Sequence, residues 1–121
     1  AIYHGDFTPW NIRVNPAGEW TALDWERGDL RGIPGWDWFH YEVQTAILKR
    51  RCSPEQVATH VETLLTSCRF QRYATTAGFG ECSRQLLVAY LLHQNRVIRP
   101  SDGLQVSLQL QQLLATRWRL V

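Results

Sequence analysis

The pattern of apolar and polar residues predicts a short β-hairpin near the start of the chain. Apolar and polar residues alternate in Ile12-Arg13-Val14, as in a strand with one buried face, and Trp20 to Leu23 is the predicted return strand. Between them lies Asn15-Pro16-Ala17-Gly18, in which proline presets one corner of a turn and glycine supplies positive φ. The sequence therefore predicts two antiparallel strands joined by this turn.

Helical periodicity follows a loop, Glu26 to Gly35, that is punctuated by Gly, Asp and Pro. The clearest helix start is Ser53-Pro54-Glu55-Gln56, which has a serine cap, a proline at the first helical position and a glutamine three residues after the serine. The predicted helices span residues 36–50, about 53–67, 81–97 and 104–118, and a short helix ending in a Gly-rich turn is predicted within 69–80.

These elements predict an α+β fold that is mainly α, with one β-hairpin followed by four or five helices in a single domain over residues 1–121. A chain of this length buries about 65% of the surface that its unfolded form exposes. The apolar stripe of segment 81–97 comprises Leu86, Leu87, Tyr90, Leu91 and Val97. Most of the tryptophans near the hairpin are predicted to build the core, although they would also suit a carbohydrate-stacking platform: Trp10, Trp20, Trp25, Trp36 and Trp38.

Charge is distributed unevenly along the chain, which has a formal net charge of +2. Residues 1–42 carry seven acidic and three basic side chains, and residues 43–121 carry four acidic and ten basic ones. The basic side chains are spread over several predicted helices, with Lys49-Arg50-Arg51 as the only run, so solvated helix surface is favoured over an anion-binding face. A nucleic-acid binder would interleave aromatic and basic residues. Here the aromatics concentrate in the acidic part, so nucleic acid is not an expected partner.

Cysteine and apolar content indicate a cytoplasmic protein without a membrane partner. No apolar run approaches the ~20 residues of a membrane-spanning helix. Three cysteines without the paired spacing of a zinc site predict buried thiols in a reducing compartment: Cys52, Cys68 and Cys82. Three histidines on the predicted helices lack metal-binding spacing and are assigned to surface or core packing: His40, His60 and His93.

The residues with candidate chemistry lie on either side of the hairpin. One group is His4-Gly5-Asp6-Phe7-Thr8-Pro9-Trp10-Asn11, and the other is Leu23-Asp24-Trp25-Glu26. A loop can present Asp6 and Asn11 on one side, and the hairpin returns Asp24 to face them. A carboxylate there could accept the proton of a substrate hydroxyl, while an amide oxygen and a second carboxylate are suitable Mg²⁺ ligands. The alternative is that each is a turn or capping residue.

Together the two motifs resemble those of the aminoglycoside phosphotransferase and choline kinase family, small-molecule relatives of the protein kinases. The corresponding protein-kinase motifs are His-Arg-Asp-x-x-x-x-Asn and Asp-Phe-Gly. Gly5 replaces the arginine of the first motif, and Trp25-Glu26 replaces Phe-Gly in the second. The resemblance covers Tyr3 to about Glu42 in motif detail and the rest only as a helical pattern. It implies the C-terminal lobe of a protein-kinase-like fold.

The resemblance also implies a role for each motif residue. Asp6 would position and deprotonate an acceptor hydroxyl, and Asn11 and Asp24 would bind Mg²⁺ together with the phosphates of ATP, the co-substrate. The implied function is ATP-dependent phosphorylation of a hydroxyl on a sugar, amino alcohol, aminoglycoside-like compound or related metabolite. The basic helical part favours a neutral or anionic acceptor over a polycationic one.

Three further residues have supporting roles in this interpretation. Asp37, three residues after Pro34, would brace the backbone of the catalytic loop; the alternative is an acidic residue favourably placed at a helix N-terminus. His4 is expected to be structural, with its ring packed and hydrogen-bonded inside the loop. Glu26 is a weaker candidate, as an outer contact of the metal or a contact to the acceptor.

The sequence contains no Gly-rich phosphate-covering loop of the kind found in the nucleotide-binding N-terminal lobe of such kinases. The chain is therefore expected to be the C-terminal part of a longer kinase, with the missing lobe as its partner, and to be inactive alone. The alternative is a non-catalytic kinase-like module that binds nucleotide or a protein partner.

Overall fold

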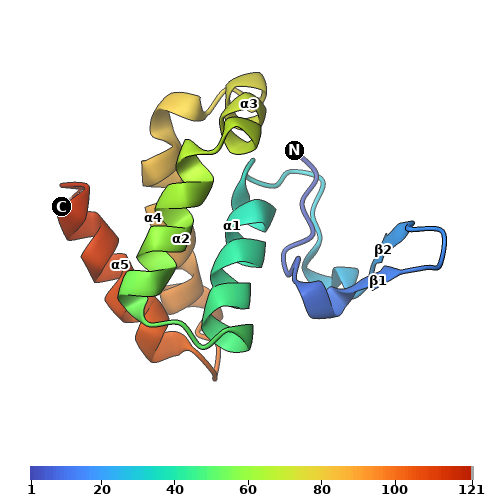
Figure 1. Cartoon of the computed structure of the whole chain (residues 1–121), viewed down its shortest axis with the longest axis horizontal. Helices are drawn as coiled ribbons and strands as arrows, with labels where there is room; N and C mark the ends of the chain where they lie inside the picture. The colour runs from blue at the N-terminus through green and yellow to red at the C-terminus, as the bar shows by residue number, and fades with distance from the viewer. Residues whose placement is uncertain (121) are drawn as a thin grey trace.

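The computed structural model describes residues 1–120 and consists of a helical bundle with a projecting β-hairpin (Figure 1). The hairpin consists of β1 (Ile12–Val14) and β2 (Trp20–Ala22) and comes first along the chain. The α-helices are α1 (Trp36–Gln44), α2 (Pro54–Thr66), α3 (Cys68–Ala77), α4 (Ser83–His93) and α5 (Leu104–Arg117). The predicted class, mainly helical α+β with one hairpin before the helices, is confirmed for this part of the chain.

The core lies inside the bundle, where α5 packs along α2 and α4, and α1 packs against the same two helices. Helix α3 follows α2 closely and packs on it. Burying one large apolar side chain stabilises a fold by about 1.5–3 kcal/mol, so these contacts dominate stability. The fully buried apolar side chains come from all five helices and include Phe39, Val43, Val57, Val61, Phe70, Leu87, Leu91, Leu110 and Leu114.

Helix α2 begins at the predicted position. The Ser53 hydroxyl accepts a hydrogen bond from the Gln56 backbone N–H (3.2 Å), and the Gln56 side-chain oxygen accepts one from the Ser53 N–H (2.8 Å). Each bond satisfies a backbone donor that the first helical turn leaves free. The capping box expected from Ser53-Pro54-Glu55-Gln56 is confirmed.

Helices α1 and α4 each continue into a π-helical turn, over Thr45–Lys49 and Gln94–Ile98. In a π-helical turn the backbone bonds span five residues, so the turn holds an extra residue and the helix faces shift. The side chain of Val97 is consequently 67% exposed, whereas that of Gln94 is buried. The prediction of an inward-facing Val97 was wrong because the α-helical period ends before this residue.

The hairpin has the predicted strands and turn. Ile12 pairs with Ala22 and Val14 with Trp20, and the Gly18 N–H donates to the Asn15 carbonyl (2.9 Å). The two strands form a sheet of their own, and the hairpin extends away from the bundle in Figure 1.

The tryptophans divide between the hairpin region and the bundle. Trp36 and Trp38 on α1 are half-buried against the core, whereas Trp10, Trp20 and Trp25 are exposed. The prediction that most of the five belong to the core was wrong, because no described helix covers the projecting hairpin.

The cysteines also differ from the prediction. Cys68 and Cys82 are exposed and Cys52 is half-buried, so the three free thiols are not the buried ones expected. Cys68 is the first residue of α3 and Cys82 immediately precedes α4, and side chains at helix ends have fewer neighbours. Among residues 1–120, no helix combines the length and apolar character needed to span a membrane.

Candidate active site

Asp37 holds the loop that contains His4 and Gly5 against the first turn of α1. One carboxylate oxygen accepts a hydrogen bond from the His4 backbone N–H (2.6 Å), and the other accepts one from the Gly5 N–H (3.0 Å). Hydrogen bonds to an ionised acceptor are stronger than neutral ones, and both oxygens are used here. The bracing contact implied for Asp37 by the family resemblance is present.

Replacing Asp37 with Asn should therefore destabilise the fold by about 1–3 kcal/mol, because the new amide nitrogen would face one of the two backbone donors and leave it unpaired. Urea unfolding of the chain measures this loss. Glu55→Gln is a matched control, since Glu55 is an exposed acidic residue in the first turn of α2. A helix-terminal charge alone contributes about 0.3–1 kcal/mol. Equal losses in the two variants would favour the helix-terminus interpretation of Asp37.

Gly5 occupies a position that other residues fit poorly. Its φ is +88°, and a Cβ atom there would lie 2.5 Å from the Arg27 carbonyl oxygen. A side chain would be strained by the backbone and would collide with Arg27. The glycine therefore allows the loop to approach the segment that follows the hairpin.

His4 joins the loop to the return strand. Its ring is buried; Nδ1 accepts a hydrogen bond from the Asp6 backbone N–H (3.1 Å), and Nε2 donates to the Leu23 carbonyl (2.6 Å). The Leu23 N–H in turn donates to the Asn11 carbonyl (2.7 Å). The structural role expected for His4 agrees with these contacts, which bring Asp6, Asn11 and the residue before Asp24 together.

Asp24 follows Leu23 and has a left-handed backbone conformation, with φ 64° and ψ 59°. Asp and Asn tolerate this region better than most residues, but it still stores about 1–3 kcal/mol of strain. Its carboxylate is exposed beside the end of β2. The strain at Asp24 is held by the contacts of Leu23 and directs the chain into the short helical turn Trp25–Arg27.

The side-chain amide of Asn11 is oriented by Asp6. Its nitrogen donates to the Asp6 carbonyl (2.9 Å) and to Asp6 Oδ2 (3.2 Å). Both partners are acceptors, so the NH₂ group must face them and the amide oxygen is left for another ligand. Asn11 is thus prepared to offer an oxygen atom.

The oxygen atoms of Asn11 and Asp24 suit Mg²⁺ bound together with nucleotide. Mg²⁺ usually keeps several waters and takes only one or two protein carboxylates plus substrate phosphates. In residues 1–120, no group of three or more His, Cys, Asp and Glu side chains is placed to hold a metal. Asn11 and Asp24 supply oxygen donors of the kind that such a shared site uses.

Glu26 is less closely connected to the site than the other predicted residues. It lies in the helical turn Trp25–Arg27 with an exposed side chain, and no hydrogen bond joins that side chain to the described residues. Its contact to the metal or the acceptor stays a prediction.

His40 is a site residue that the sequence pattern did not reveal. Its Nε2 lies 2.8 Å from Asp6 Oδ1, although the two residues are 34 positions apart. The side chain of His40 is 5% exposed and that of Asp6 34%. Asp37, His40 and Gln44 recur at spacings of three and four, so one face of α1 carries polar residues toward the loop. That spacing is the signal that could have pointed to His40.

The hydrogen bond from His40 is the main cause that lowers the pKa of Asp6 below its ordinary value of 3.8. Partial burial opposes this effect, and the nearby Arg27 guanidinium and the Asn11 amide reinforce it. Asp6 is therefore ionised at neutral pH, and its side chain acts only as a hydrogen-bond acceptor.

A lowered pKa in the folded state predicts a specific pH dependence of stability. Ionised Asp6 contributes stability at all pH values above its unfolded pKa, and this contribution is lost as the pH falls through the lower folded value. Urea unfolding of the chain and of Asp6→Asn should therefore differ by a constant amount above about pH 4 and converge at more acidic pH. A difference that grows on acidification would contradict this assignment.

A cavity of about 460 Å³ opens beside Asp6. Its volume lies within the range of about 300–1,000 Å³ that is usual for small-molecule sites. The cavity lies between the loop that carries Asp6, the π-helical ends of α1 and α4, and the turn before α5. The lining residues are Asp6, Trp10, Arg27, His40, Gln44, Leu48, Gln94, Ile98, Arg99, Pro100, Ser101 and Asp102.

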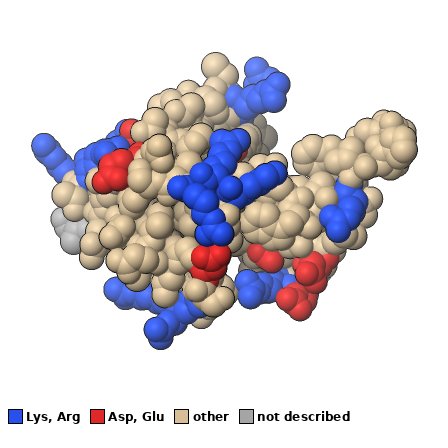
Figure 2. All heavy atoms as spheres, turned by 60° about the horizontal axis from the view of Figure 1, so that its bottom comes forward, with Lys and Arg blue, Asp and Glu red and all other residues tan. Residues whose placement is uncertain are grey.

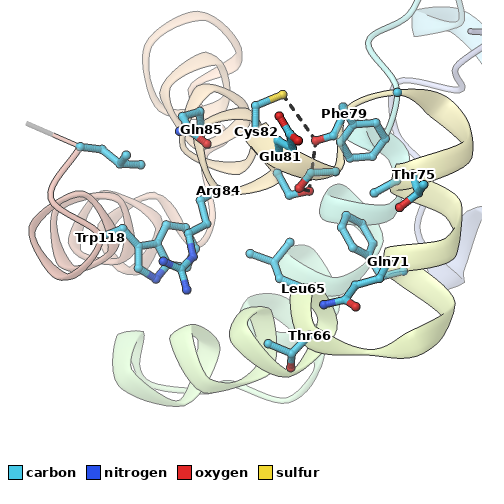
Figure 3. Close-up of a pocket in the computed structure, with 16 residues that line it drawn as sticks. Leu65, Thr66, Gln71, Thr75, Phe79, Glu81, Cys82, Arg84, Gln85 and Trp118 are labelled. Carbon is cyan, nitrogen blue, oxygen red and sulfur yellow. Dashed lines mark hydrogen bonds between the residues drawn. The ribbon is translucent and has the colours of Figure 1, made fainter.

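A larger hollow of about 1160 Å³ lies away from the loop, among α2, α3, α4 and the end of α5 (Figure 3). The Arg84 guanidinium stacks over the Trp118 ring there, 5.3 Å from its centre. The Cys82 thiol and the Ser83 hydroxyl, which line this hollow, each donate to the Phe79 carbonyl (3.4 Å). None of the predicted site residues lines this hollow, so it is not the candidate active site.

Basic side chains form separate groups on the face shown in Figure 2, with uncharged surface between them. One ion pair joins Arg51 to Asp102 (3.6 Å), and another joins Arg117 to Glu62 (2.8 Å). Arg51 and Arg117 are therefore each paired with a neighbouring carboxylate at the surface.

The site thus brings together Asp6, Asn11 and the strand end that carries Asp24, and it adds His40. Comparisons of the chain with protein-family models, with curated proteins and with solved structures found no significant match.

Proposed function

We propose that this chain is the acceptor- and metal-binding part of an ATP-dependent phosphotransferase that acts on a hydroxyl of a small molecule. Asp6 would accept the hydroxyl proton at a carboxylate oxygen as the phosphoryl group is transferred. Asn11 and Asp24 would hold Mg²⁺, which when bound neutralises charge on the nucleotide phosphates.

The observation that carries the proposal is the joint orientation of Asp6 and Asn11. A single amide donates to Asp6 and leaves its oxygen for a cation, so one interaction prepares both the base and a metal ligand. A turn or capping role would not require the amide oxygen to be left free. The resemblance of both motifs to the small-molecule kinases supports the same assignment.

The cavity beside Asp6 is the proposed acceptor site. Arg27 and Arg99 line it together with the carboxylates of Asp6 and Asp102, and Asp102 is already paired with Arg51. The cavity therefore offers polar groups of both signs to a hydroxyl compound. Two arginines favour an acceptor that also carries a phosphate or carboxylate group.

The metal site can be tested on the 121-residue chain with Mn²⁺ as a paramagnetic substitute for Mg²⁺. Amide signals of Asn11 and Asp24 should broaden first in ¹H–¹⁵N spectra, and an excess of Mg²⁺ should restore them. Because only two protein ligands are available, we expect an affinity of about 1 mM, equivalent to about 4 kcal/mol.

Asp24→Asn should abolish this broadening, and Glu81→Gln, an exposed acidic residue of the distant hollow, should not change it. Broadening centred elsewhere would contradict the assigned ligands. Release of ADP from ATP by the full-length protein, measured with a panel of hydroxyl compounds, separates a kinase from a non-catalytic module. Metal binding without any transfer would favour the module.

A further inference from the structure

A chain of hydrogen bonds runs from the core of the bundle to Asp6. Gln44 Nε2 donates to the Tyr90 hydroxyl oxygen (3.2 Å), that hydroxyl lies 2.8 Å from His40 Nδ1, and His40 Nε2 lies 2.8 Å from Asp6 Oδ1. His40 and Gln44 both belong to α1, with Gln44 as its last residue, and Tyr90 belongs to α4. The two helices that line the cavity therefore meet Asp6 through this chain.

The positions of the protons follow from the partners. Tyr90 is fully buried, and burial raises the pKa of its hydroxyl, so the hydroxyl keeps its proton. Its oxygen already receives a hydrogen bond from Gln44, and the adjacent acceptor for its own proton is His40 Nδ1. A ring that accepts at Nδ1 carries its proton on Nε2, which then donates to the Asp6 carboxylate.

We propose that His40 is the positioning residue of Asp6: Tyr90 fixes the His40 ring with a proton on Nε2, and this ring locks the carboxylate that faces the acceptor cavity. His40 holds Oδ1 while Asn11 holds Oδ2, so the carboxylate cannot rotate about its Cβ–Cγ bond. An ionised carboxylate offers about four lone pairs, and those that these contacts leave free are available to an acceptor hydroxyl. The catalytic consequence rests on the proposed phosphotransferase function, whereas the hydrogen-bond chain does not.

The ring state can be measured in the isotope-labelled chain by long-range ¹H–¹⁵N correlation of the histidine rings at neutral pH. We expect His40 to show a protonated Nε2 and an unprotonated, hydrogen-bonded Nδ1. Tyr90→Phe should shift the Nδ1 signal toward that of a nitrogen without a donor. Tyr73→Phe is a matched control, because the Tyr73 hydroxyl instead accepts from the Gly35 N–H (2.9 Å). It should leave both His40 signals unchanged.

The positioning role can be measured by kinetics of the full-length protein. His40→Leu removes the donor to Asp6, and loss of a hydrogen bond to a charged group should lower kcat about 10- to 100-fold. His40→Gln keeps a side-chain N–H at a similar reach and should restore most of this loss. The KM for nucleotide should stay unchanged in both, because His40 acts on the base rather than on the phosphates.

Two results would overturn the inference. One is a His40 ring in the unaltered chain that is protonated on Nδ1 or on both nitrogens. The other is an equal kcat in the Leu and Gln variants of an active kinase, which would leave the proposed function intact. A full-length protein that shows the expected ring state but transfers no phosphate would instead overturn the proposed function and the catalytic part of the inference.

Discussion

Replacing Asp6 with Asn should lower the kcat of the full-length protein by about 100- to 10,000-fold, the usual contribution of a general base. The carboxylate accepts the proton of the acceptor hydroxyl in the proposed mechanism, and an amide cannot accept that proton. The nucleotide Kd should change little, because Asn11 keeps its hydrogen bond to the Asp6 backbone carbonyl (2.9 Å) in this variant and so stays oriented. Steady-state kinetics and calorimetric titration with nucleotide measure the two quantities separately.

Asp29→Asn is the matched control for loss of charge. Asp29 is an exposed carboxylate in the loop that follows the hairpin, and it bonds locally to the Arg31 N–H (2.9 Å). This variant should retain normal kcat. Weakened nucleotide binding with an unchanged kcat in Asp6→Asn would move Asp6 from the acceptor to the phosphates.

Replacing Asp24 with Asn should nearly abolish turnover while the fold stays intact. Asn tolerates the left-handed backbone of this position as Asp does, so the hairpin and the turn after it should form normally. The variant loses a charged metal ligand, and we expect a decrease in kcat/KM of about 100-fold or more, equivalent to about 2.7 kcal/mol. The Mg²⁺ concentration needed for half-maximal activity should also rise.

Glu19→Gln tests whether any acidic residue near the hairpin has this effect. Glu19 lies in the hairpin turn, where its side-chain oxygen accepts from the Asn15 amide (3.0 Å), and Gln can keep this bond. Activity and thermal stability should be unchanged. If Asp24→Asn retained more than about a tenth of the activity, a cost below about 1.4 kcal/mol, Asp24 would not be a metal ligand.

Local sequence patterns were sufficient for most of the secondary structure. The turn at Gly18 and the cap at Ser53 each depend on residues within a few positions, and both formed as predicted. The helix boundaries also lie close to the predicted positions, because they too depend on nearby residues. The turn chemistry and helix period are properties of short segments, so one sequence contains the necessary information.

The sequence-based predictions that were wrong or incomplete involve contacts between distant segments. His40 bonds to residues 34 and 50 positions away, and no local pattern reports such a partner. Trp20 has the apolar character of a core residue, but its burial depends on what covers the hairpin. The proximity of Asp6 and Asn11 could be predicted, because a loop of this short spacing can present both side chains on one side, and they are hydrogen-bonded. The contact between Asp6 and His40 on α1 could not be predicted from the sequence.

The π-helical turns at the ends of α1 and α4 separate two parts of the molecule that can change independently. Each turn lies in the wall of the cavity, while the regular helix before it packs in the core. Loss or gain of one residue in such a turn rotates the chain beyond it by about 100° and leaves the preceding helix in register. Small insertions and deletions at these two points therefore offer a route by which the lining of this cavity could change while the helices before the turns keep their packing.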